Sequence, residues 1–212
     1  MNSNEAEENL RVIRSLMEKA TIYRAISAPT ALVGGLAASV AGVALVATEN
    51  CYTSPNLVFM VVWMSVLALT AASNAFFLHR DARRRGEQFI SPGMKMALRA
   101  LLPSHFAAAV VTSLVFAPER HGLCILLPYA WCVLYGMGLL SMNHFAPRSI
   151  ARLGWAFLIA GLLMTVFVVL DVQMFSCRCE MLTNYTMAAT FGLFHLIYAA
   201  CTWPRGGRKV NG

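Results

Sequence analysis

The residues with the greatest capacity for chemistry are five polar side chains set within long apolar stretches. His195 and Tyr198 are one helical turn apart, and Asn74, His105 and Tyr135 lie in three other stretches. If each stretch is a helix that crosses a membrane, all five fall in the same half of it, at ~1.5 Å of rise per residue. Ionisable groups inside a membrane usually face the helix bundle and often mark function. We call these five residues the polar layer.

The polar layer allows three interpretations. In the first, His105 and His195 are neutral and hydrogen-bond to Asn74, Tyr135 or a backbone carbonyl, so the layer is structural. In the second, the layer grips a ligand or relays protons in a small transporter or channel. In the third, the two histidines are axial ligands of a haem. We favour the structural interpretation, in which the layer binds no cofactor.

A second group of reactive side chains lies between the apolar stretches, on the face with few basic residues. Cys51 stands in one connection there, and Cys177 and Cys179 stand in another. An oxidising exterior allows Cys51 to form a disulfide with Cys177 or Cys179, which leaves one thiol over. Unlinked thiols are one alternative. A zinc or copper site that also uses His121 is the other.

Enzyme signatures are missing from the sequence. It contains no H-E-x-x-H, no glycine-rich phosphate loop, no G-x-S-x-G and no pair of aspartates within an apolar stretch. Membrane enzymes can use dispersed residues, so this absence favours a protein that is not an enzyme without deciding it.

These side chains must be positioned by elements that suit a bilayer. Apolar residues make up 58% of the 212 residues and charged residues 13%, against roughly 25% charged in soluble domains. A helix of about 20 apolar residues crosses ~30 Å of hydrocarbon and satisfies its own backbone groups. The sequence therefore predicts an all-α, polytopic membrane protein with one bundle of six transmembrane helices over residues 26–203. The expected spans are 26–47, 57–78, 98–117, 122–142, 150–170 and 182–203.

The distribution of positive charge orients the bundle. Of the 17 Lys and Arg residues, all but Arg120 and Arg178 fall before the first span, in or at the edge of alternate connections, or in the basic tail at 204–212. Basic segments stay on the cytoplasmic side, so we expect both termini in the cytoplasm. The same bias accounts for the net charge of +7, and no nucleic-acid partner is expected.

The densest basic cluster is formed by Arg83, Arg84 and Arg85, between the second and third spans. Its functional interpretation is a contact with anionic lipid headgroups. The alternative is a topogenic cluster that serves only to orient the chain. The lipid bilayer is the partner in both cases.

Residues 1–25 form a separate cytoplasmic unit. Leu10, Ile13 and Met17 share one face of an amphipathic helix predicted over 5–23, which is too polar to cross the bilayer. This helix could bury the three residues in the membrane interface or against the bundle, or it could bind a protein partner. The acidic start of the chain is unlike a secretory signal, so we expect the unit to be retained.

Small residues and prolines within the spans predict how the helices pack. The small-residue face within 34–42, together with Gly136 and Gly154, should let helix backbones approach closely. Pro103 and Pro128 should each release a carbonyl group and kink their helices.

Four short runs carry a resemblance that touches most of the chain. They are residues 13–20 (IRSLMEKA), 134–139 (LYGMGL), 153–155 (LGW) and 191–198 (FGLFHLIY). On these runs the chain resembles a family of uncharacterised small bacterial membrane proteins with six helices. The resemblance implies a bacterial inner-membrane location and no particular activity. The family often continues Tyr-Gly where this chain has tyrosine followed by Ala199.

We therefore expect an integral membrane protein that acts as a non-enzymatic accessory or sensory subunit. A small transporter or channel that uses the polar layer around His105 and His195 is the first alternative. A haem or metal redox protein of the membrane is the second.

Overall fold

The computed structural model describes residues 5–13, 28–48, 55–86, 90, 92–115, 126–144, 146–170 and 179–203. The regular elements in these ranges are all helices, which confirms the predicted all-α class. After a short helix at residues 5–13, the chain forms α2 (Ala28–Ala47), α3 (Pro55–Arg85), α4 (Pro92–Val115), α5 (Leu127–Ser141) and α6 (Arg148–Leu170). A last helical run follows, made of α7 (Cys179–Met187), the π-helix η3 (Ala188–Phe194) and α8 (His195–Thr202).

Four helices, α2, α3, α4 and α6, are long and apolar enough to cross a membrane. The helix α5 is also apolar but has 15 residues. The last helical run is divided by its π segment. These lengths and compositions are those of a multi-pass membrane protein.

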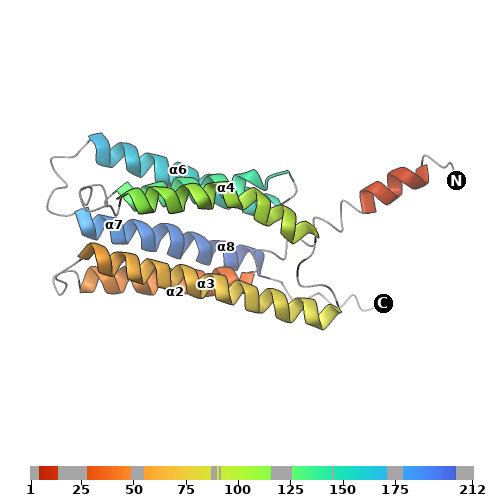
Figure 1. Cartoon of the computed structure of the whole chain (residues 1–212), viewed down its shortest axis with the longest axis horizontal. Coiled ribbons are helices and arrows are strands. Elements are labelled where there is room, and N and C mark those ends of the chain that lie inside the picture. The colour runs from red at the N-terminus through yellow and green to blue at the C-terminus, as the bar shows by residue number, and fades with distance from the viewer. Residues whose placement is uncertain are drawn as a thin grey trace.

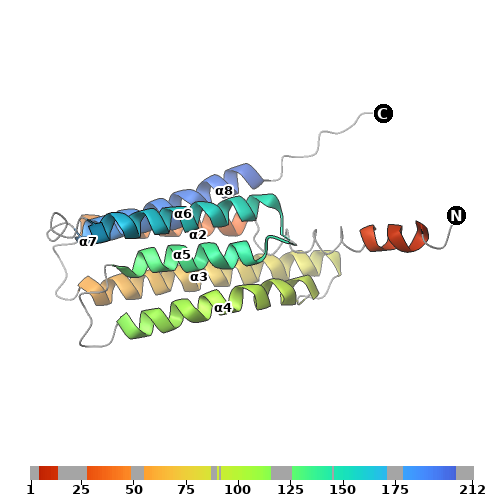
Figure 2. The same ribbon diagram turned by 90° about the horizontal axis from the view of Figure 1, so that it is seen from above.

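The helices stand side by side and follow one another around an arc (Figures 1 and 2). α4 packs on α5, α5 on α6, and α6 on the last helical run, which packs along α2. α3 then packs on the other side of the series, against α2. α3 and α4 are neighbours in the sequence, yet they form the two ends of the arc. The first turn of α2, the last turn of α3 and the last turn of α8 lie at the same end of the bundle (Figures 1 and 2).

Glycines let two of these helix pairs touch backbone to backbone, as the small residues predicted. A Cβ atom on Gly136 of α5 would lie 2.7 Å from the backbone nitrogen of Leu158 and 2.8 Å from the carbonyl oxygen of Gly154, both on α6. A Cβ atom on Gly35 of α2 would lie 3.0 Å from the carbonyl oxygen of Gly192 in η3. Larger residues at either position would push the helices apart, because carbon atoms pack best at about 3.5–4.0 Å.

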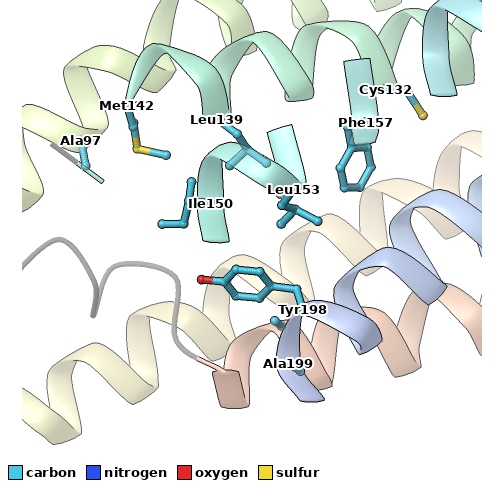
Figure 3. Close-up of a cluster of buried hydrophobic side chains, with 10 residues drawn as sticks. Ala97, Cys132, Leu139, Met142, Ile150, Leu153, Phe157, Tyr198 and Ala199 are labelled. Atoms are coloured by element: carbon cyan, nitrogen blue, oxygen red, sulfur yellow. The ribbon is translucent and has the colours of Figure 1, made fainter. Parts of the chain in front are cut away.

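The main apolar core lies where α5, α6 and α8 meet (Figure 3). Leu139 of α5, Met142 directly after it, and Ile150 and Phe157 of α6 are each at most 1% exposed, so this contact is fully closed. Tyr198 of α8 extends toward the same cluster (Figure 3). A second buried cluster joins α2, α3 and α7.

The two prolines that were expected to kink helices differ in position. Pro103 lies inside α4, as predicted. Pro128 lies in the first turn of α5, which begins at Leu127. A proline there removes an amide that has no partner within the helix, so it starts the helix instead of bending it. The kink predicted at Pro128 was therefore wrong.

The amphipathic segment is helical over residues 5–13, the part of it that the structure describes. Leu10 is 66% exposed and Ile13 is 53% exposed. These two side chains are therefore not buried against the bundle, and burial in the membrane interface or against a protein partner remains a prediction. Met17 lies outside the described residues. The apolar face remains open to contacts outside this chain.

Candidate functional site

A hydrogen bond between two side chains of the polar layer joins α5 to the start of α8. The hydroxyl oxygen of Tyr135 lies 2.9 Å from Nε2 of His195, and Nδ1 of His195 lies 3.0 Å from the carbonyl oxygen of Phe191. A carbonyl oxygen can only accept, so Nδ1 carries the proton and Nε2 has the lone pair. When the imidazole is neutral, the Tyr135 hydroxyl donates to its Nε2.

The carbonyl oxygen of Phe191, which the imidazole contacts, lies in the π-helix η3. In an unbroken α-helix, the backbone N–H of His195 would bond to this oxygen, four residues earlier. Here that N–H bonds to the carbonyl oxygen of Gly192 instead. The side chain of His195 binds at Phe191 and is held in one orientation. π segments within α-helices are frequent at functional sites.

Aromatic rings pack around this hydrogen bond. The ring centroid of Phe157 lies 4.8 Å from that of Tyr135 and 5.4 Å from that of His195. Phe191 lies 5.5 Å from Tyr135, and Phe194 lies 5.4 Å from Phe157. Few competing polar groups surround the bond, and a low local dielectric strengthens it. Tyr135 and His195 are each only half-buried, so the pair is packed without being sealed.

His105, an exposed residue of α4, contacts Tyr135 of the same pair. Its ring centroid lies 6.3 Å from that of Tyr135 in an edge-to-face contact. Its Nδ1 lies 2.9 Å from the carbonyl oxygen of Leu101, one turn earlier. The structure thus places His105, Tyr135 and His195 in one series of ring contacts, with the tyrosine in the middle.

Of the two other members of the polar layer, Tyr198 belongs to the core cluster against which Tyr135 packs, whereas Asn74 lies elsewhere. Asn74 on α3 accepts a hydrogen bond from the hydroxyl of Thr30 on α2, at 3.2 Å. This hydrogen bond joins the two helices. Tyr198 is buried in the core beside Ile150 and Leu153 (Figure 3).

A buried polar face on the last helical run was not predicted. Thr183, Asn184, Thr186 and Thr190 are each 4–7% exposed. The thiol of Cys132 on α5 lies 3.4 Å from the hydroxyl of Thr190. Oδ1 of Asn184 is buried and has no hydrogen-bond partner among the described residues. The spacing of the threonines, at three and four residues, was the sequence signal that could have revealed this face.

Several predicted site residues fall outside the described part of the chain. Cys51, Cys177 and His121 are among them, so the proposed disulfide or metal site remains a prediction. Cys179 is the first residue of α7, but its side chain is also outside that part. Of the arginine cluster, Arg83 and Arg84 are exposed near the end of α3, and Arg85 is its last residue.

The arrangement of the two histidines does not suit a bis-histidine haem. Nδ1 of His195 carries a proton that it donates to Phe191, and the lone pair on Nε2 is engaged by the Tyr135 hydroxyl, so His195 offers no free lone pair to iron. In the described ranges no group of three His, Cys, Asp or Glu side chains is placed to hold a metal ion. The chemistry that the site can perform as it stands is hydrogen bonding and proton exchange between a phenol and an imidazole.

Comparisons of this chain with protein-family models, with curated proteins and with solved structures find no match. The interpretation of the site therefore rests on its own geometry.

Proposed function

We propose that this chain is a six-span protein of the bacterial inner membrane, with both termini in the cytoplasm. We further propose that it acts as a non-enzymatic accessory or sensory subunit. The observation that carries this proposal is the packed centre of the bundle, where the rings of Tyr135, Phe157 and His195 are in contact and His195 is hydrogen-bonded to Tyr135 and to the backbone.

Six spans require that α5 and the last helical run cross the membrane as well as the four long helices. α5 covers about 22 Å at ~1.5 Å per residue, which is short of ~30 Å, but a thinned bilayer can accommodate a short helix. It lies between α4 and α6 and packs on both, which supports a crossing. An even number of crossings also agrees with α2 starting and α8 ending at the same end of the bundle.

An accessory or sensory role fits a bundle whose interior is tightly packed and whose outer faces expose apolar side chains. Its interior is held together by close helix contacts at glycines and by the hydrogen bond between Tyr135 and His195. Uncovered apolar surface lies on α3, on α4 and on the helix at residues 5–13. A protein built in this way acts on other molecules through its outer faces. We propose that the apolar face of the N-terminal helix, with Leu10 and Ile13, binds a protein partner.

A small transporter is the second candidate, and one observation favours it. The Tyr135–His195 hydrogen bond lies directly after a π-helix, is half-buried, and has His105 on its exposed side. A π segment can change its hydrogen bonding locally. Such a change would free the imidazole for a ligand or a proton.

Topology is tested first, by labelling intact cells with a membrane-impermeant maleimide. Single cysteines are introduced into a chain from which the six native cysteines have been removed. Cysteines at Tyr52 and Glu180 should be labelled from outside, and one at Gly86 should not. Labelling at Gly86 would overturn the proposed orientation.

Flux measurements then separate the two candidate functions. Purified protein in liposomes should move protons and potassium no faster than empty liposomes. The His195→Phe variant keeps an aromatic ring but removes both nitrogens, and it should behave in the same way. A flux that wild-type protein supports and His195→Phe abolishes would replace the accessory role with transport.

A further inference from the structure

The helices α3 and α4 leave apolar surface uncovered around much of their circumference. α3 packs mainly on α2, and α4 packs mainly on α5. Leu67 and Leu69 of α3 are 55% and 52% exposed, although they stand about 200° apart around the helix. On α4, Leu98 is 57% exposed and Phe106 is 71% exposed. On both helices, the apolar surface available to the bilayer is therefore wider than one narrow stripe of side chains.

Positive charge gathers where α3 ends and α4 begins. Arg83 and Arg84 lie in the last turn of α3, Lys95 and Arg99 lie in the first turns of α4, and all four are exposed. The connection between the helices has six residues, so the end of α3 and the start of α4 lie at most about 25 Å apart. Between residues 76 and 99 the sequence has six basic residues and two acidic ones. We call the four exposed cations the basic hairpin.

Aromatic residues mark the level at which the apolar surface gives way to charge. The guanidinium of Arg80 lies 5.5 Å from the ring centroid of Phe77. Phe76, beside it, is 61% exposed. Aromatic rings next to cations are typical of the headgroup level of a membrane. Toward the end of α3 this level is followed by Arg83 and Arg84, and in the other direction by the exposed leucines.

We propose that α3 and α4 together bind an anionic diacyl phospholipid, with its phosphate at the basic hairpin and its acyl chains along the exposed apolar surfaces. This inference rests on the proposed insertion of the chain into a membrane. A phosphodiester offers a negative charge and acceptor oxygens, which arginine and lysine side chains match. A zwitterionic lipid with the same chains brings a cation of its own, which the basic hairpin repels. Charge complementarity therefore selects the occupant.

The helix α6 provides an internal comparison. It starts with Arg148 and carries Arg152 one turn later, and both are exposed. Its Trp155 and Ile159 are 53% and 51% exposed, so it also combines cations with apolar surface. Both of these cations come from one helix. A general attraction of lipid to any basic helix end would treat α6 and the basic hairpin alike.

The test is native mass spectrometry of the full-length protein in mild detergent, titrated with phosphatidylglycerol or with phosphatidylcholine of the same chains. Three variants are compared with the wild type: Arg83→Gln with Arg84→Gln, Lys95→Gln with Arg99→Gln, and Arg148→Gln with Arg152→Gln. Each removes two charges from exposed positions. Melting temperature and elution volume show whether each variant is folded. A photoactivatable phosphatidylglycerol, cross-linked to wild-type protein in liposomes, identifies the contacted helices without any substitution.

The wild type should bind phosphatidylglycerol more tightly than phosphatidylcholine. Each substitution pair in the basic hairpin should weaken phosphatidylglycerol binding roughly tenfold, while the α6 pair should have little effect. Equal binding of the two lipids, equal effects of all three pairs, or cross-links spread evenly over α6 would overturn the proposal. So would equal competition by glycerol phosphate, because that ligand lacks acyl chains. Absence of the protein from the membrane fraction would instead contradict the proposed function.

Discussion

The hydroxyl oxygen of Tyr135 lies 2.9 Å from Nε2 of His195, so two helices whose residues are 60 positions apart share one hydrogen bond. The bond has a defined direction, because Nδ1 of the same imidazole already donates to the carbonyl oxygen of Phe191. It links α5 to the last helical run at the centre of the bundle.

Tyr135→Phe should lower the stability of the protein by about 0.5–2 kcal/mol, because it leaves Nε2 of His195 without its donor. The double variant with His195→Phe should lose less than the two single variants added together, by about 0.5 kcal/mol or more. Unfolding in detergent measures all three. Tyr185→Phe is the matched control, since Tyr185 is 55% exposed, and it should change little. Strictly additive losses would show that the two side chains are not coupled.

Gly136→Val should destabilise the bundle by about 1–3 kcal/mol or more, because its side chain would collide with the backbone of Leu158 on α6. Ala109→Val adds methyl groups at an exposed position of α4 and serves as the control. Thermal unfolding and size-exclusion chromatography in detergent compare the two. Equal stability of both variants would mean that α5 and α6 are not in close backbone contact.

Asn184→Leu should leave stability unchanged or raise it by about 1 kcal/mol, since it removes a buried acceptor that has no partner in the described ranges. Thr190→Val, on the same face, should lower stability because it removes the hydroxyl that Cys132 contacts. The unfolding midpoints of both variants, compared with that of the wild type, measure these changes in stability. A large loss for Asn184→Leu would reveal that this amide binds a molecule in the native protein.

Replacing Leu10 and Ile13 by aspartate should weaken the contact of the N-terminal helix with its partner roughly tenfold or more, since burying each such side chain contributes ~1.5–3 kcal/mol. Cross-linking in whole cells from a photoreactive residue at Val12, also exposed, measures the contact. Substitution of Glu7 and Arg11 by alanine changes the same helix without touching Leu10 or Ile13. If both pairs of substitutions leave the cross-links intact, this apolar face is not the docking surface.

Much of the helical architecture was predictable, because a bilayer restricts the choice of structures. Backbone groups in hydrocarbon must be satisfied internally, so long apolar runs such as 26–47 and 150–170 have to be helices. These runs coincide closely with α2 and α6. The second run, predicted over 57–78, continues as helix to Arg85. Hydropathy identifies the apolar part of a helix, whereas the hydrogen bonds that sustain the helix do not end where the apolar side chains do.

The sequence by itself determined which helices are apolar and where along each one the polar residues stand, because helical rise converts residue number into position. It did not determine which side chains meet, since that depends on the rotation of each helix and on the choice of neighbours. Asn74 and His195 were assigned to one layer, yet Asn74 bonds to Thr30 on α2. The π segment of η3, a local change of hydrogen bonding with no clear signature in the sequence, accompanies the turn of His195 toward Phe191. Only the tertiary structure decided that Tyr135 and His195 form the pair.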